Sequence, residues 1–136
     1  MKKHIIILTT ALISVFQQLV ANERWEVYNS YRTYTQIEDF HDQLFVRSGT
    51  SIFVTDIDGV NTDNFNKVDG LSSSTVQFIA KCENADLLAF VHNDGVIDVM
   101  DANGNFDFIF DLKNKSVVGD KTIKNVTICD DKLYLA

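Results

Sequence analysis

Residues 76–110 read VQFIAKCENADLLAFVHNDGVIDVMDANGNFDFIF, and this stretch decides the fold of the chain. Four short runs rich in β-branched and aromatic residues alternate with turn-forming residues, at 76–81, 86–91, 95–100 and 106–110. The Asp-Gly pair ending at Gly95 and the Asn-Gly pair ending at Gly104 are strong hairpin signals, because tight hairpin turns require positive φ. The stretch therefore predicts four antiparallel strands joined by short turns, as in an all-β protein.

The pattern repeats along the chain. Three apolar triplets are spaced by 44 and then 46 residues: Leu44-Phe45-Val46, Leu88-Ala89-Phe90 and Tyr134-Leu135-Ala136. A run rich in β-branched residues precedes each triplet. A period of 40–50 residues that holds about four short strands is the period of a β-propeller blade. In the first unit the fourth strand is expected near Phe65 to Val68.

The predicted fold class is all-β: a partial β-propeller of about two and a half four-stranded blades, after an N-terminal signal peptide. A closed propeller typically has at least four blades around its channel. The sequence supplies two full units and half of a third, so either it is the front piece of a longer protein or the missing strands come from elsewhere. An unpaired strand at its end would be an exposed edge, which proteins normally avoid, so we expect the first.

The first residues have the order of a secretory signal peptide. Positive residues from Lys2 precede an apolar run from Ile5 to about Phe16, and a small residue, Ala21, marks the expected cleavage site. The run is about 12 residues long, whereas a membrane-spanning helix needs about 20. The predicted domains are therefore a signal peptide over 1–21 and an incomplete N-terminal propeller over 22–136, exported to the periplasm or cell surface.

Charge and cysteine content narrow the function. The formal net charge is −7, and it becomes more negative once the two lysines of the signal are removed. Such a chain repels phosphate backbones and anionic lipid, which argues against nucleic-acid partners and electrostatic membrane docking. Cys82 and Cys129 lack metal-type spacing, and export leaves a disulfide between them open. Their equivalent places in successive units favour two core residues.

Two acidic turns invite a calcium interpretation, since Ca²⁺ takes oxygen ligands at alternate positions. They are Asp56–Gly59 and Asp101–Asn105. An EF-hand loop needs Gly at its sixth position and Glu at its twelfth, and neither segment provides them. Both are predicted to be hairpin turns.

Other candidate residues also fail to form a chemical site. His41 and His92 lie among turn residues without a partner histidine at ligand spacing, and Ser72–Ser74 lacks the G-x-S-x-G elbow of a nucleophile. The sequons at Asn114 and Asn125 matter only in a host that glycosylates asparagine. We therefore predict no enzyme activity, no catalytic, cofactor-binding or metal-binding residues and no cofactor.

Aromatic residues near the mature start are a further candidate. Trp25, Tyr28, Tyr31 and Tyr34 could stack on sugar, although packing against the first blade is the stronger expectation.

Four segments carry a resemblance to a known family. Residues 67–79 look like the "DGLS…V…I" signature of two-component-regulator-type propeller repeats. The opening Trp25–Tyr28, the strand pair Asn93–Val99 and the segment Asp120–Val126 are similar to those of the PorZ-like proteins of Bacteroidetes. The four segments occur in the same order, and the resemblance covers 25–136.

The resemblance implies a surface protein of the type IX secretion system that acts with a sortase-type partner in attaching cargo. It implies a non-catalytic interaction module with protein partners of the secretion apparatus, and it identifies no binding residue here. The alternative is a periplasmic ligand-sensing propeller of a hybrid two-component regulator. Sensor repeats usually carry a Trp–aromatic pair in each blade, whereas this chain has one Trp, which favours the first interpretation.

The signature residues also have physical roles of their own. Gly70 is expected at a tight turn between units, with Leu71 inserted between blades and Ser72 bonded to nearby backbone. Asp98 alternates with Ile97 and Val99, so it should point away from them.

Overall fold

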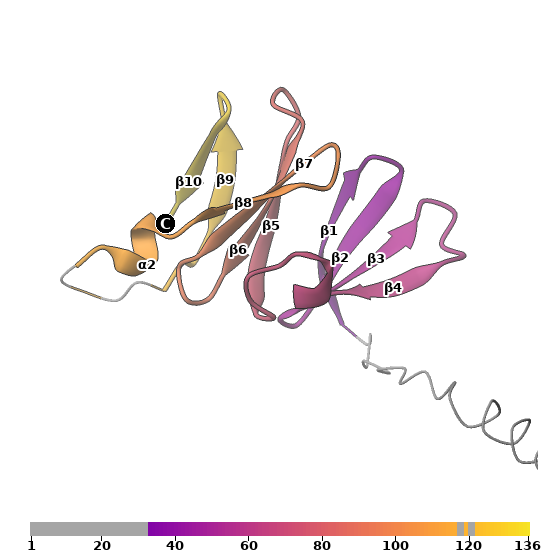
Figure 1. Cartoon of the computed structure of the whole chain (residues 1–136), viewed down its shortest axis with the longest axis horizontal. Coiled ribbons are helices and arrows are strands. Elements are labelled where there is room, and N and C mark those ends of the chain that lie inside the picture. Colours follow the sequence, from indigo (N-terminus) through magenta and orange to yellow (C-terminus); the bar gives the residue numbers. More distant parts are fainter. Residues whose placement is uncertain (1–32, 117–118, 120–121) are drawn as a thin grey trace, which may run out of the picture.

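The computed structural model describes residues 33–116, 119 and 122–136 and has three antiparallel sheets side by side (Figure 1). Residues 1–32, which include the predicted signal peptide and Trp25, lie outside the described part. The first sheet has the order β1-β2-β3-β4, and the second has the order β5-β6-β7-β8. The predicted all-β class and partial propeller are confirmed.

Each sheet is a meander of short strands. The strands of the first sheet are β1 (Tyr34–Phe40), β2 (Gln43–Ser48), β3 (Ser51–Asp56) and β4 (Thr62–Phe65). Those of the second are β5 (Val76–Cys82), β6 (Leu87–His92), β7 (Ile97–Asp101) and β8 (Phe106–Ile109). A two-stranded sheet follows, made of β9 (Val126–Cys129) and β10 (Lys132–Leu135). A 3-10 helix, η1 (Lys67–Asp69), and one helical turn, α2 (Asp111–Asn114), lie between strands.

The first strands of successive sheets adjoin one another, as blades do around a propeller axis. β1 contacts β5, and β5 contacts β9. β1 and β5 also carry a register shift at the same place, between Tyr34 and Gln36 and between Val76 and Phe78. The two sheets are therefore repeats of one structural unit.

Glutamine side chains join these inner strands. Gln36 Oε1 accepts from Ile79 N at 2.9 Å, and Gln36 Nε2 donates to Ile79 O. Gln77 Nε2 donates to Ile123 O at 2.6 Å, toward the third sheet. Each bond satisfies buried or half-buried backbone that has no strand partner there.

The core lies between the sheets. Buried side chains from both four-stranded sheets form one cluster: Phe40, Phe45, Ile52, Leu71, Val76, Ile79, Leu88, Phe90 and Met100. A second cluster of Ala89, Val91, Ile97 and Ile123 joins the second sheet to β9 and β10. Leu71 is 4% exposed in the first cluster, which confirms its expected place between blades.

Two expected positions were wrong. β4 ends at Phe65, and the chain then enters η1, because the Asn66 side chain accepts from Val68 N and caps that turn. Tyr134 is not the counterpart of Leu88. Leu133 takes that role, as the second residue of its strand, and packs toward the preceding sheet.

Within the described ranges, no helix is both long and apolar enough to cross a membrane.

Candidate functional site

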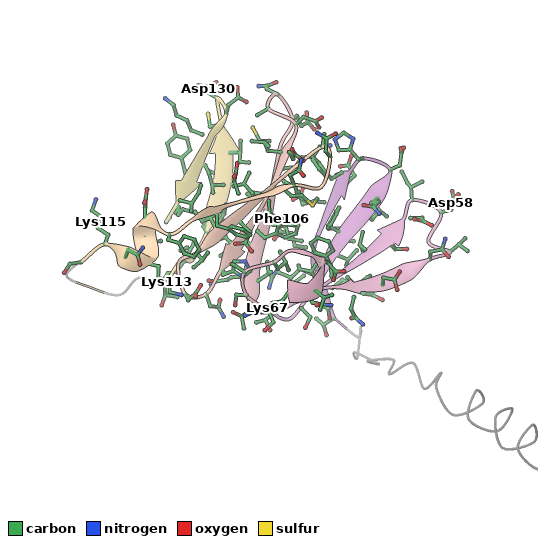
Figure 2. The ribbon with its side chains drawn as sticks, viewed as in Figure 1. Asp58, Lys67, Phe106, Lys113, Lys115 and Asp130 are labelled. Atoms are coloured by element: carbon green, nitrogen blue, oxygen red, sulfur yellow. The ribbon has the colours of Figure 1, made fainter. Side chains whose placement is uncertain are left out.

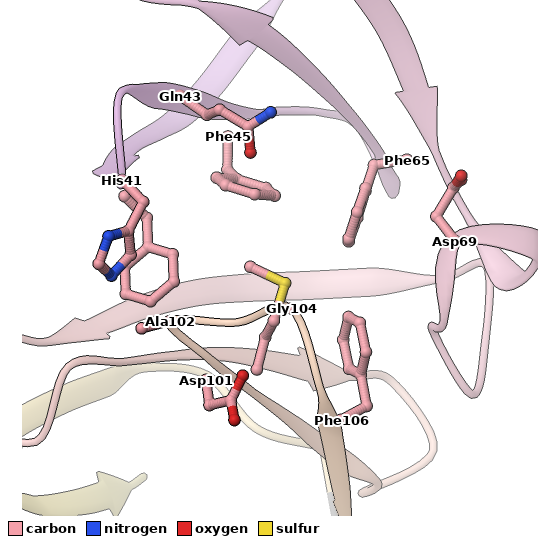
Figure 3. Close-up of a pocket in the computed structure, with 11 residues that line it drawn as sticks. His41, Gln43, Phe45, Phe65, Asp69, Asp101, Ala102, Gly104 and Phe106 are labelled. Atoms are coloured by element: carbon pink, nitrogen blue, oxygen red, sulfur yellow. The ribbon is translucent and has the colours of Figure 1, made fainter.

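A pocket of about 210 Å³ lies between the first two sheets (Figure 3). Its apolar lining comes from Phe40, Phe45, Phe65, Met100 and Phe106. Its polar and small lining comes from His41, Gln43, Asp69, Asp101, Ala102 and Gly104. Pockets for drug-sized ligands occupy about 300–1,000 Å³, so this one suits a single inserted side chain better than a whole metabolite.

The aromatic walls are held by one another. Phe45 meets Phe65 edge to face at 5.2 Å between ring centroids, and Phe65 stacks on Phe90 at 5.5 Å. Phe106 lies 6.2 Å from Phe65 and 6.3 Å from Phe90, near the middle of the molecule (Figure 2). These rings come from four strands of both sheets. Since they pack at favourable aromatic separations, the pocket is preformed.

The polar groups around the pocket are engaged in local structure. Asp69 accepts from Asn66 N at 2.8 Å, and His41 Nε2 lies 2.8 Å from Asp86 Oδ1. Asp101 Oδ1 accepts from the backbone N–H groups of Asn103 and Asn105, each at 2.8 Å. The side chain of Asn105 and then its backbone N–H lower the pKa of Asp101. Asp101 is therefore a turn-forming carboxylate that stays ionised.

A hydrogen-bonded network joins the connector between the first two sheets, residues 66–75, to the second sheet. Asp98 Oδ2 accepts from Ser72 N at 2.7 Å, and Asp98 Oδ1 accepts from Ser72 Oγ at 2.6 Å. His92 Nε2 lies 2.7 Å from Asp98 Oδ2, and both residues are 0% exposed. The Nδ1 atom of His92 finds no hydrogen-bond partner among the described residues.

The three side chains of this network are not in the order that serine hydrolysis requires, and the network instead anchors the connector to the second sheet. In a hydrolytic triad the histidine lies between serine and carboxylate and accepts the serine proton. Here Asp98 lies in the middle, so Ser72 donates to the carboxylate and not to His92. Burial raises the pKa of Asp98, but the hydrogen bonds from His92 and Ser72 outweigh it and leave the pKa below its ordinary value. Asp98 points away from Ile97 and Val99, as expected, whereas Ser72 bonds this side chain and not backbone.

Both candidate calcium segments lie in hairpin turns. Residues 57–61 connect β3 to β4, and residues 102–105 connect β7 to β8. Asp58 lies at the tip of its hairpin, as Asp130 does in the third sheet (Figure 2). Among the residues that the structure describes, no three His, Cys, Asp or Glu side chains are grouped to hold a metal ion.

The remaining candidates are separated in space. His41 forms the β1–β2 turn with Asp42, and both have positive φ, at 46° and 59°. His92 is buried at the end of β6, so the two histidines occupy different environments. Asn114 lies in α2, and Asn125 precedes β9.

The two cysteines are free thiols at the ends of β5 and β9, which are equivalent places. Cys82 is buried and donates to Asp131 Oδ1 at 3.3 Å. Cys129 is exposed, so the expectation that both are core residues is wrong for Cys129. Its side chain lies on the opposite face of the third sheet from Val126 and Ile128, which are partly covered.

Sequence reasoning missed the Ser72–Asp98–His92 network and the pocket. Ser72 and Asp98 are separated by 26 residues in the chain, and no local pattern pairs them. The alternation Phe106-Asp107-Phe108-Ile109-Phe110 was a signal for an aromatic row along one face of β8.

One family model and one solved structure match this chain. Residues 44–136 match the family described as "TSS9, PorZ, N-terminal beta-propeller domain". A structure of PorZ from Porphyromonas gingivalis, described as an essential bacterial surface component of the type-IX secretion system, matches with a TM-score of 0.66 and 24% identity. The match covers 74% of this chain and 14% of that chain. At that identity, the likeness shows the fold alone.

No curated protein matches this chain. The family match takes in well over half of the sequence and includes the Ser72–Asp98–His92 network and most of the residues that line the pocket. This chain therefore belongs to the family of PorZ N-terminal β-propeller domains.

Proposed function

We propose that this chain is a non-catalytic interaction module of a surface component of the type IX secretion and cargo-attachment machinery. The family match over residues 44–136 is the observation that carries the proposal. The PorZ of Porphyromonas gingivalis is a surface component of that system, and the proposal transfers this role to the present chain. Its partners would be other proteins of the apparatus, including a sortase-type enzyme.

The geometry supports an interaction role over a catalytic one. His92, which is buried, and Ser72, which is half-buried, are both bonded to Asp98, and the carboxylates around the pocket serve turns. The preformed aromatic pocket has the size of one side chain, which fits an anchor residue from a protein partner. A packed seam between blades gives such a partner a rigid surface at low entropic cost.

The proposal includes export. Residues 1–21 would be removed as a signal peptide, which places the remaining chain in the periplasm or on the outer surface of a Gram-negative cell. N-terminal sequencing of the secreted protein should begin at Asn22. An unprocessed Met1 on protein isolated from the envelope would contradict this part.

Deletion of the gene tests the proposed role. We expect cargo of the type IX system to lose surface attachment in the deletion strain and to regain it when the wild-type gene is restored. Normal cargo attachment in the deletion strain would refute the role. A transcriptional response to glycans that disappears while cargo attachment stays normal would instead support the sensor alternative.

A further inference from the structure

The outer edge of the second sheet differs chemically from that of the first. β4 and β8 are the fourth strands of their sheets, and among the described strands each pairs on one side only, with β3 and β7 respectively. β4 reads Thr-Asp-Asn-Phe, with polar residues at its exposed positions. β8 and the residue after it expose Phe108, Ile109 and Phe110 by 45%, 41% and 43%.

Proteins normally protect such an edge with charge, proline or a covering segment, because unpaired N–H and C=O groups accept another strand. Each strand carries one aspartate, Asp63 in β4 and Asp107 in β8, but only the β8 edge also exposes large apolar side chains. The two edges belong to repeats of one unit in the same chain, so the contrast does not arise from the fold itself.

The aromatic row on β8 continues from the pocket. Phe106 forms a pocket wall and stacks on Phe108 at 6.3 Å, and Phe108 lies 6.4 Å from Phe110. Phe106 and Phe108 are alternate residues of β8 and share a face, and Phe110, which follows the strand, extends this row of rings through its contact with Phe108. The opposite face of β8 carries Asp107 and Ile109, and Asp111 is the first residue of α2.

We propose that β8 is a strand-addition site for an extended segment of a protein partner that alternates apolar and basic residues. Main-chain hydrogen bonds to the free edge of β8 would give affinity, and the alternate side chains would give specificity. The apolar residues would cover Phe108 and Phe110, with one large residue entering the pocket beside Phe106. A basic residue would face Asp107, and Asp111 at the start of α2 adds negative charge close to the end of the strand. The identity of the partner rests on the proposed function, but the site itself does not.

Charge favours this occupant over a second copy of the chain. From Asn105 to Asp111 the segment contains two aspartates and neither lysine nor arginine, and the whole chain carries a net charge of −7. A basic strand is attracted both by the aspartates of this segment and by the net negative charge of the chain. A second copy of the chain is repelled by both, because it carries the same charges.

The test is binding of a synthetic seven-residue peptide, capped at both ends, that alternates lysine with valine and phenylalanine. Two control peptides have the same apolar residues, one with glutamate in place of lysine and one with a central proline. Fluorescence anisotropy with the full chain gives the affinities, and amide hydrogen exchange gives the location. We expect the lysine peptide to bind at least about tenfold more tightly than either control and to protect β8 amides but not β4 amides.

Substitutions in the chain sharpen the test. The double substitution Phe108→Thr, Phe110→Thr should weaken binding by about tenfold, because it removes the aromatic stripe while keeping strand-forming residues. The matched control Ile37→Thr removes an apolar group that is 56% exposed elsewhere and should leave binding unchanged. All three positions are more than 40% exposed, so the fold should tolerate these changes.

Several results would overturn the proposal. They are equal binding of the glutamate or proline peptide, unchanged binding by the threonine double variant, and protection of β4 in place of β8. Dimerisation of the peptide-free chain through β8, seen as concentration-dependent protection of its amides, would assign the edge to a second copy. These measurements do not involve secretion, so their failure leaves the proposed type IX role standing, and a failed deletion test leaves the binding site standing.

Discussion

Removing the carboxylate of Asp98 should destabilise the protein more than any other single change in a polar side chain. The Asp98 side chain is 0% exposed and accepts two hydrogen bonds from Ser72 and one from His92. Through these bonds it holds the segment that carries Leu71 between the two blades. The perturbation is Asp98→Ala, compared with Asp98→Asn and Ser72→Ala.

The magnitude follows from the groups that lose their partner. Asp98→Ala leaves the Ser72 N–H and the His92 Nε2 atom buried without their acceptor, at about 1–3 kcal/mol each. Breaking a buried pair by removing one partner costs about 3–5 kcal/mol in all, so we expect a loss in that range. Asp98→Asn keeps the volume and one acceptor oxygen and should cost about 2–3 kcal/mol. Ser72→Ala removes only the hydroxyl bond and should cost about 1–2 kcal/mol.

Urea-induced unfolding, followed by circular dichroism, measures these free energies. The order Asp98→Ala, then Asp98→Asn, then Ser72→Ala is expected, and the Ser72→Ala, Asp98→Ala double variant should fall short of the sum by about 1 kcal/mol or more. Asp107→Ala, an exposed aspartate on the neighbouring strand β8, is the matched control and should change stability by less than about 0.5 kcal/mol. A loss below about 1 kcal/mol for Asp98→Ala would refute the anchoring role.

Three further predictions follow from the same seam. Because hydrogen bonds hold the pKa of folded Asp98 below its ordinary value, the contribution of Asp98 to the free energy of unfolding is complete at neutral pH and is lost as the pH falls through the folded pKa. In urea unfolding from about pH 7 to pH 3, the Asp98→Asn variant should therefore lose less stability on acidification than the wild type. Identical pH profiles for the two proteins would contradict this. Gly70 has φ 121°, and a Cβ added there would lie 2.6 Å from two ring atoms of Phe106. Gly70→Ala should therefore lower the free energy of unfolding by about 2–4 kcal/mol in the same assay. Gly104→Ala, whose Cβ would meet nothing within 4 Å, is the control, and an equal loss in both would show that backbone strain alone decides. Leu71→Ala should cost about 2–5 kcal/mol by leaving a cavity between the blades, whereas Val68→Ala, at a site 94% exposed, should be nearly neutral; similar losses would contradict the inserted position of Leu71.

The strands of the second sheet could be predicted from sequence because local signals agree there. Gly95 and Gly104 mark the turns with φ of 79° each, and the runs between them have strand periodicity. The observed strands begin and end within two residues of the predicted ones. The equivalence of Leu44 and Leu88, each the second residue of its strand, also follows from the repeat.

Prediction of strand positions was weaker where the local sequence signals are few or irregular. The fourth strand of the first sheet has one apolar residue, Phe65, which is also its last residue. The next residue, Asn66, caps η1 with its side chain, so the strand does not continue. In the third sheet the equivalent residue is Leu133 and not Tyr134, and the lengths of the turns and connectors differ from unit to unit, so the sequence spacing alone did not give the register.

The site could not be predicted because it depends on contacts between distant parts of the chain. The pocket takes residues from both four-stranded sheets, and Asp98 of β7 bonds Ser72, which lies 26 residues earlier in the chain. The family resemblance identified the fold-forming residues of the connector, and the structure supplied their bonding partners. Trp25 and the predicted signal peptide lie outside the described residues, so the expectations for them remain predictions.

The central claim is that two separate four-stranded sheets pack face to face through their side chains, with β1 beside β5. Nuclear Overhauser contacts in the isotopically labelled chain test it directly. The account predicts contacts between the side-chain amide of Gln36 and the backbone amide of Ile79, and between the rings of Phe45 and Phe90, whose centroids lie 5.8 Å apart. A ladder of backbone contacts joining β4 to β5 would mean one continuous sheet and would contradict the account.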